Sequence, residues 1–368
     1  MAEELTMSDS VNHRRTRTRS VLAAVMTVLI LVPAGVLFTR VWSDVSDRRA
    51  GTKLEQKGVE YLAALAPLVS SLAEAQSSAL SGVSDPPASL TTAVNGVAAV
   101  DQRLGGDLRT RDRWTGLRQK IELLPKTTGD PLTVLQAHVE VADLTLALYE
   151  AVRDNSELAR DPDNDLAHLQ EAVGVDLPTT VVEVSRMGDY SQLVAKATAA
   201  QLAQLSPQFG AAVLAVNTYV NRLTDNLQAA VDNTTSGTLS GSLVSGLDSF
   251  RRGVESLTRG ANPGGVPNAA TMATAQSQLQ VSLSNLSNIT VREMATLLQD
   301  RLDRLAYREA ETLAAGVLIA LLIVGAVVLP LTGRRRRGRP IHSEAARDVT
   351  VGPGDVDTTR REHASALR

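Results

Sequence analysis

Two uncharged apolar runs, one near each end of the chain, constrain this sequence more than any other feature. They cover residues 20–39 and 313–332, and neither contains an acidic or basic side chain. A helix of about 20 apolar residues can cross the roughly 30 Å hydrocarbon core of a bilayer. The first run has the basic start of a signal peptide, but no small-x-small cleavage site follows it, so we interpret it as an uncleaved anchor. The sequence therefore predicts two transmembrane helices and a lipid bilayer as a partner.

Arginines on the outer flank of both runs predict the orientation, because positively charged flanks stay in the cytoplasm. We expect a two-pass protein of a bacterial cytoplasmic membrane with both termini inside. Residues 1–19 and the basic tail 333–368 are expected to be cytoplasmic and disordered, and residues 40–312 extracytoplasmic. The flanking residues are Arg14, Arg15, Arg17 and Arg19 before the first run, and Arg334, Arg335, Arg336, Arg337 and Arg339 after the second.

The composition of the outer part favours helices and argues against several kinds of site. Residues 40–312 contain 24 Lys and Arg against 32 Asp and Glu, a net charge of −8. Nucleic acid, which needs clustered cations, is therefore not an expected partner. The chain has no cysteine, so disulfides, thiolate zinc sites and cysteine nucleophiles are excluded. Aromatic residues are only 3%, which disfavours strands, and no motif for a cofactor or a nucleophile is found.

Apolar residues recur at steps of three and four, as at Tyr61, Leu65, Leu68 and Leu72, and this spacing predicts an all-α fold. We expect two transmembrane helices flanking an elongated up-and-down extracytoplasmic bundle, built as one bundle or as two stacked four-helix modules. Asp130 before Pro131 predicts a helix start. The expected helices are 20–80, 89–124, 131–159, a fourth ending near 187, a fifth over 188–231 that breaks or kinks at Pro207, a short helix 243–259, and a last one from 268 into the second span.

Three stretches of the outer part carry a resemblance to a known family. They are Glu55-x-x-Gly58-x-x-Tyr61-Leu62-x-x-Leu65; Val100-Asp101-x-Arg103-Leu104-Gly105 followed by Trp114-x-x-Leu117; and Asp154-Asn155-Ser156-x-Leu158-x-x-Asp161-Pro162-Asp163-x-Asp165 before Leu177-Pro178. In order and spacing, residues 45–330 resemble the extracytoplasmic helical sensor domain of bacterial methyl-accepting chemotaxis proteins, sensor histidine kinases and diguanylate cyclases. The resemblance implies a helical sensor that acts as a dimer.

The sequence departs from that family in two places. In the family, the second membrane helix leads into a HAMP linker and an output domain, whereas fewer than thirty residues follow Arg339 here. We therefore expect a module without its own transmitter, read by a separate partner protein. The family's Tyr-Tyr pair after the Asp-Pro-Asp motif is replaced by Leu166-Ala167-His168, so ligand contacts are not carried over from those positions.

Two groups of polar residues are candidates for ligand binding. Arg103 and Arg111 belong to an arginine cluster on the second expected helix; a pair facing the interior would bind a small anion, whereas solvated arginines would bind nothing. Asp154, Asn155 and Ser156 interrupt an apolar seam, and they either face a pocket or form a frayed helix end.

No metal site is expected. Asp161, Asp163 and Asp165 have the spacing of the first ligands of a calcium loop, but the required Gly and Glu are missing, which favours a helix break. His138 and His168 lie on different expected helices without a second ligand at a suitable spacing, which favours a half-buried helical histidine.

These observations predict a membrane-anchored sensory or regulatory module, a homodimer that signals through a partner. The alternative is a structural scaffold or cell-envelope subunit without a small ligand. An enzyme is the weakest of the three hypotheses, because no catalytic constellation stands out.

Overall fold

The computed structural model describes residues 4–83, 85–159, 164–233, 237–262 and 267–333, without the side chains of 4–24, 27, 164–165, 237–240, 242 and 326–333. The chain divides into two units, residues 33–315 and residues 1–32 with 316–368. Within the described residues every regular element is helical, as the sequence predicts. The expected all-α fold class is confirmed at this level.

The first helix, α1, runs from Glu4 to Leu80 with Pro33 and Pro67 inside it. It begins earlier than the sequence analysis expected, so residues 4–19 are helical in this structure, where no proline or glycine interrupts them. Its C-terminus is closed by Gly82 at φ +88°, which lets the Val83 N–H donate to the Ser78 carbonyl at 3.0 Å. This left-handed glycine ending is a common way to satisfy the last carbonyls of a helix.

The second expected helix is two helices, α2 (Ala88–Leu104) and α3 (Arg111–Leu123), so the prediction of one helix over 89–124 is wrong. Gly105 and Gly106 stand at the break, and two adjacent glycines cost enough helix propensity for the chain to turn. A short 3₁₀ turn, η1 (Leu124–Lys126), leads to α4 (Pro131–Asn155). The predicted start of α4 is confirmed, because Asp130 accepts a hydrogen bond from the Thr133 N–H at 2.7 Å.

A continuous helical stretch follows, made of α5 (Asn164–Glu171), the π-helical turn η2 (Ala172–Asp176) and α6 (Leu177–Lys196). The wide turn precedes Pro178, which has no N–H for an i−4 hydrogen bond. The predicted break at Gly188 is wrong. Gly188 is buried inside α6, where a Cβ would overlap Gln276 Oε1, so this glycine serves close packing rather than a turn.

The remaining helices are α7 (Ala199–Asn233), α8 (Gly237–Ala261) and α9 (Ala269–Gly333). Helix α7 continues through Pro207, so of the two predicted alternatives the break is wrong. Helix α8 begins at Gly237, earlier than the expected residue 243. The start of α9 agrees with the prediction, since Asn268 Oδ1 accepts from the Thr271 N–H at 3.0 Å. Tertiary packing overrides the weak helix propensity of the Ser- and Gly-rich segment, because α8 buries Leu243, Leu247 and Phe250.

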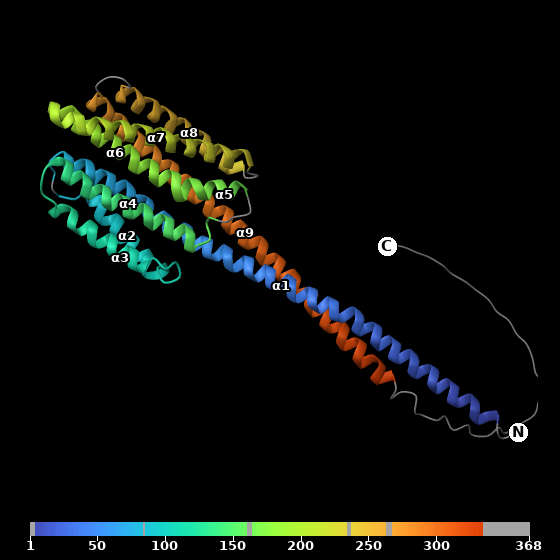
Figure 1. The fold of residues 1–368 in the computed structure, drawn as a ribbon. Coiled ribbons are helices and arrows are strands. Elements are labelled where there is room, and N and C mark those ends of the chain that lie inside the picture. Colours follow the sequence, from blue (N-terminus) through green and yellow to red (C-terminus); the bar gives the residue numbers. More distant parts are fainter. Residues whose placement is uncertain (1–3, 84, 160–163, 234–236, 263–266, 334–368) are drawn as a thin grey trace, which may run out of the picture. The chain divides into compact units, whose positions relative to one another are not determined.

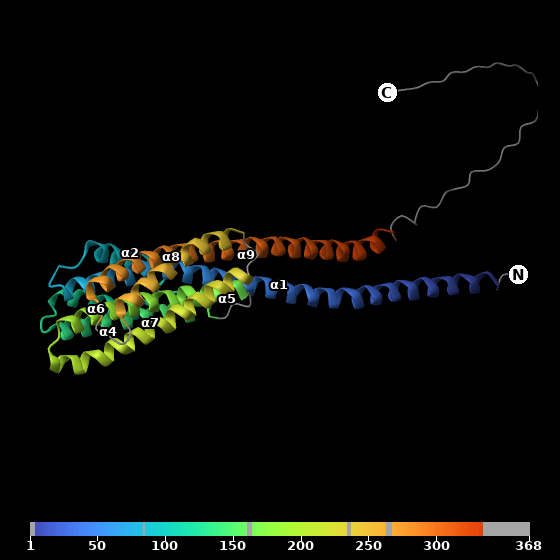
Figure 2. The same cartoon turned by 90° about the horizontal axis from the view of Figure 1, so that it is seen from above.

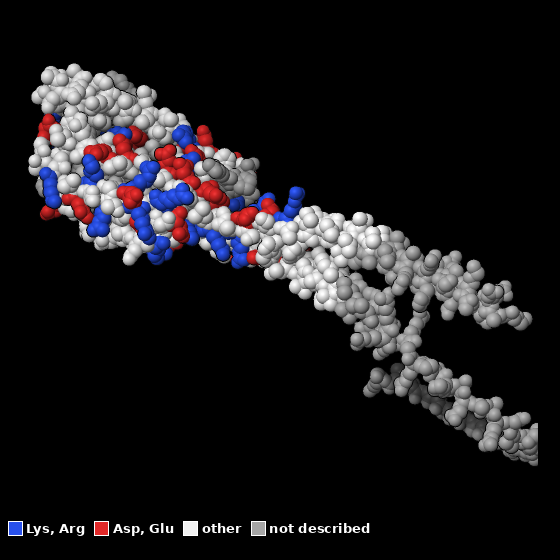
Figure 3. Space-filling view, turned by 60° about the horizontal axis from the view of Figure 1, so that its bottom comes forward, with Lys and Arg blue, Asp and Glu red and all other residues white. Residues whose placement is uncertain are grey.

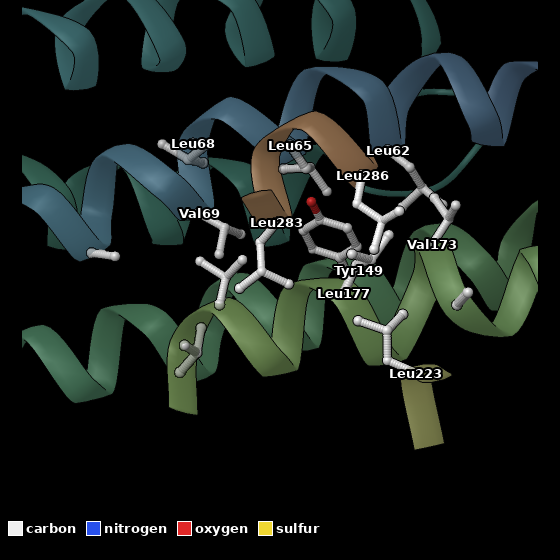
Figure 4. Packing of buried hydrophobic residues seen from close by; sticks show 14 of the residues in the cluster. Leu62, Leu65, Leu68, Val69, Tyr149, Val173, Leu177, Leu223, Leu283 and Leu286 are labelled. Carbon is white, nitrogen blue, oxygen red and sulfur yellow. The ribbon is translucent and has the colours of Figure 1, made fainter. Parts of the chain in front are cut away.

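Within residues 33–315, successive long helices run antiparallel and lie alongside one another (Figures 1 and 2). Helices α1–α4 form one group and α6–α9 the other, and buried apolar residues of both groups belong to one continuous cluster. The groups are therefore side by side around a shared core, not stacked end to end. Tyr149 of α4 lies in this core among Leu65, Leu283 and Leu286 (Figure 4).

One described helix segment, Val28–Leu80 of α1, is long and apolar enough to cross a membrane, and only 6% of its most apolar window is buried. The second predicted span, 313–332, does not meet the same criterion among the described side chains, which end at 325. Its described part nevertheless exposes large apolar residues. They include Leu313, Val317, Leu318, Leu321, Leu322 and Val324.

Candidate functional site

Helices α1 and α9 pair in a fixed antiparallel register within residues 33–315. Arg49 forms an ion pair with Glu309, Glu55 pairs with Arg301 at 3.1 Å, and Gln56 Nε2 donates to Gln299 Oε1 at 3.1 Å. The Glu55–Arg301 pair is largely buried, and such pairs fix geometry more than they add stability. These contacts connect α1 and α9 in the half of the helix pair that is nearer in sequence to the apolar runs.

In the other half of the pair, small side chains replace the ion pairs and leave a groove between α1 and α9. The groove has a volume of about 570 Å³. Glu74 and two glutamines, Gln276 and Gln280, also line it. Six serines line it: Ser70, Ser77 and Ser78 from α1, Ser81 just after α1, and Ser277 and Ser284 from α9.

A fully buried carboxylate, Asp189 of α6, lies behind this groove. Its Oδ2 accepts from Gln76 Nε2 at 2.6 Å and from Ser185 Oγ at 3.3 Å, while its Oδ1 has no hydrogen-bond partner. Burial raises the pKa of Asp189 to about 7, and hydrogen bonds from Gln76, Ser185 and Ser77 oppose that rise. Asp189 is thus a titratable group at neutral pH with one open acceptor.

A smaller cavity of about 80 Å³ adjoins the groove and shares Ser70 and Ser284 with it. It lies where α1, α4, α6 and α9 meet, and Pro67, Tyr149 and Pro178 are among its lining residues. Burial raises the pKa of Tyr149, so its hydroxyl stays protonated. The groove therefore leads toward the centre of the core.

A second polar cluster surrounds the π-helical turn. Asp176 is fully buried, accepts from Asn226 Nδ2 at 2.6 Å and lies 3.2 Å from Arg222, which also pairs with Glu171 at 3.0 Å. His168 Nδ1 lies 3.0 Å from Asn226 Oδ1. Burial raises the pKa of Asp176, and the bond from Asn226 and the charge of Arg222 oppose it. Because cations and amides surround this acid, we interpret the cluster as a connection between α5, η2 and α7.

The arginines proposed from the sequence do not form an interior anion site. Arg103 is exposed and pairs with Glu60 at 2.5 Å. Arg111 is exposed at the start of α3. The surface alternative therefore describes both of them, because both side chains are exposed. On the face drawn in Figure 3, acidic and basic side chains are mixed over the bundle.

The residues Asp154, Asn155 and Ser156 form the end of α4 rather than a pocket. Asp154 is exposed, and Asn155 Nδ2 donates to the Ala151 carbonyl at 2.8 Å. Ser156 is fully buried against Gly58 of α1, where a Cβ would overlap the serine side chain. The motif residues Gly58 and Ser156 thus form a close contact between α1 and the end of α4.

Another resembling stretch also has a structural role. Tyr61 of α1 donates to Asp101 Oδ1 at 2.8 Å, and Thr110 Oγ1 donates to the same oxygen at 2.8 Å. All three side chains are buried. They fix α1 against the turn between α2 and α3.

Several expectations fall outside what the structure describes. Asp161 and Asp163 are outside the described residues, as are the side chain of Asp165 and those of all the flanking arginines.

His138 is buried, and burial lowers its pKa to about 4, which agrees with a packed, neutral histidine. Among the described residues, no group of three or more His, Asp or Glu side chains is placed to hold a metal ion.

Sequence reasoning missed the groove and Asp189. A signal was present, because Gln76 continues the seam of Leu68 and Leu72 at a step of four, where an apolar residue is expected. Gln276 precedes Leu279 and Leu283 in the same way on α9. A polar residue in phase with an apolar seam indicates a buried polar contact.

Comparison of the chain with protein-family models, with curated proteins and with solved structures finds no match. The comparisons therefore do not identify the sensor-domain family that the motifs resemble, and the function is argued from the geometry.

Proposed function

We propose that the chain is a two-pass, membrane-anchored sensory or regulatory module whose bundle lies outside the cytoplasm and whose signal is read by a partner protein. One observation carries the proposal: the helices that line the groove, α1 and α9, are the same helices that contain the two apolar runs. Each is helical without interruption between the groove and its run.

The exposed apolar side chains support the membrane part of the proposal. Residues 25–41 and 313–324 expose large aliphatic side chains in a density that soluble surfaces rarely show. Phe38 and Trp42 stack with ring centroids 6.3 Å apart, and Tyr307 is 74% exposed. Aromatic residues are enriched at membrane–water interfaces; Phe38 is in the last turn of the first run, Trp42 follows that run, and Tyr307 precedes the second run.

The groove supports the signalling part. An occupant that fits one spacing of α1 and α9 better than another shifts the population toward that spacing, in proportion to its difference in affinity. Because both helices continue into the apolar runs, such a shift has a direct path toward the membrane. The proposal assigns the readout of this shift to a partner protein.

The topology can be tested with single cysteines, because the chain has none of its own. Gln119→Cys, exposed on α3, is expected to react with a membrane-impermeant maleimide in intact cells. Ser8→Cys and Ser343→Cys are expected to react only after the cells are permeabilised. Labelling of either terminal cysteine in intact cells would contradict the proposed orientation.

The coupling can be tested without knowing the ligand. Ser78→Trp fills the groove as a tethered occupant, and spin labels at Lys53→Cys and Arg304→Cys report the spacing of α1 and α9 nearer the apolar runs. A shift of about 1–2 Å, as in other helix-shift switches, is expected. Thr91→Trp, exposed on α2, is the matched control. An unchanged distance would reject signalling and favour the scaffold alternative.

A further inference from the structure

We propose that the groove between α1 and α9 binds a linear aliphatic amine in its ammonium form. The inference deepens the proposed function by giving the sensory site a ligand class, and it rests on the proposed function for its signalling role. It is argued from the hydrogen-bonding state, the charge and the shape of the groove.

Two polar groups of the groove, Gln280 and Ser81, leave acceptors open to a ligand. Gln280 Nε2 donates to the Val181 carbonyl at 3.3 Å, which leaves its buried Oε1 without a partner. Ser81 Oγ donates to the Ser77 carbonyl at 2.9 Å, so toward a ligand this hydroxyl is an acceptor. A ligand that donates hydrogen bonds suits these two acceptors, and an ammonium group has three donors and no acceptor.

The charges have the sign that an ammonium ligand requires. Among the described residues that line the groove there is no Lys, Arg or His, whereas Glu74 lines it with an exposed carboxylate. Ser89 Oγ donates to Glu74 Oε2 at 2.7 Å and so orients this carboxylate. Asp189 adds a second acid behind the wall, with its Oδ1 open. Phosphate or carboxylate ligands would find no counter-charge here.

The shape and the apolar lining fit a thin, flexible chain. On α1 the lining residues run from Ser70 to Ser78, about 12 Å along the helix, and Ser81 and Val83 extend the groove beyond the helix end. Ala73, Ala273 and Val281 supply apolar contacts suited to methylene groups. No aromatic ring is among the described lining residues, so a nucleobase or a sugar ring would have no stacking surface.

The test is calorimetric titration of the full chain in nanodiscs with spermidine, using sorbitol and glutarate as shorter linear ligands without ammonium groups. Spermidine is expected to bind, and neither of the others. Glu74→Gln removes the exposed acid without disturbing the core and is expected to weaken binding by about tenfold, the value of one charge-assisted contact. Glu60→Gln, an exposed glutamate of the same helix outside the groove, is the matched control and should leave affinity unchanged.

The outcomes separate this inference from the proposed function. Absence of spermidine binding, equal binding of sorbitol, or equal losses in Glu74→Gln and Glu60→Gln would each overturn the amine assignment. Spermidine binding that depends on Glu74 but leaves the Lys53–Arg304 label distance unchanged would support the amine site and reject its signalling role. A label shift in Ser78→Trp without spermidine binding would support the signalling role of the groove and reject the amine site.

Discussion

The contact between Gly58 and Ser156 makes a prediction whose sign is opposite to that of ordinary helix propensity. An alanine in place of a glycine inside a helix normally stabilises it by about 1 kcal/mol. At Gly58, however, a Cβ would overlap the buried Ser156 side chain and lie 2.8 Å from Leu158 Cδ1. Gly58→Ala is therefore expected to destabilise the bundle.

The magnitude follows from two opposing contributions. Forcing an extra methyl group into a packed interface costs about 3 kcal/mol at the upper end of the usual range, and the propensity gain offsets about 1 kcal/mol of it. The net loss of about 2 kcal/mol corresponds to a fall in Tm of roughly 4 °C for a bundle of this size. Gly96→Ala, in α2 with open space around the glycine, is the control and should raise Tm.

Thermal unfolding of the full chain in detergent, followed by circular dichroism, measures this difference. Ser156→Gly in the Gly58→Ala background removes both overlapping atoms, so it is expected to recover more than half of the loss. Ser156→Ala retains the serine Cβ and should recover less. A Gly58→Ala protein as stable as the wild type would refute the packing argument.

Three further predictions concern buried groups, each measured as a free energy of unfolding. Burial raises the folded-state pKa of Asp189 from 3.8 to about 7. Relative to Asp189→Asn, the wild type is therefore most stable below about pH 4, and its free energy of unfolding falls by up to about 4 kcal/mol as the pH rises to 7. A difference between the two proteins that does not change with pH would contradict this. Tyr61→Phe should cost about 1 kcal/mol because Asp101 loses one of its two donors, and no loss would mean that Thr110 suffices. Leu65→Ala should cost about 2–5 kcal/mol, and Leu214→Ala, at a 70% exposed residue, within about 0.5 kcal/mol; equal losses would disprove the core assignment.

The sequence predicted those features of the fold that depend on local chemistry. Asp130 and Asn268 begin helices because a short polar side chain can accept from the third N–H, and no distant contact is needed for that. The seam of Leu65, Leu68 and Leu72 is buried as its spacing requires.

The predictions that were wrong concern residues whose role depends on a distant neighbour. Gly188 was interpreted as a helix break, whereas its lack of a side chain makes room for Gln276 of α9. Ser156 was a ligand candidate, whereas it fills the space above Gly58. Pairs separated by about 90 residues or more leave no periodic signal in a single sequence, so neither contact could be found by spacing.

Three buried aspartates differ in how their charge is compensated, and the difference points to the groove. Asp101 accepts from Tyr61 and Thr110, and Asp176 lies beside Arg222 and Asn226. Within the part of the chain that the structure describes, Asp189 accepts from neutral donors on Oδ2, forms no ion pair, and has no hydrogen-bond partner on Oδ1. A buried, uncompensated carboxylate destabilises the folded state. Its presence in this fold therefore suggests a role in binding. An ammonium ligand beside Ser77 and Gln276 would supply the missing positive charge, which connects the cost of Asp189 to binding in the groove.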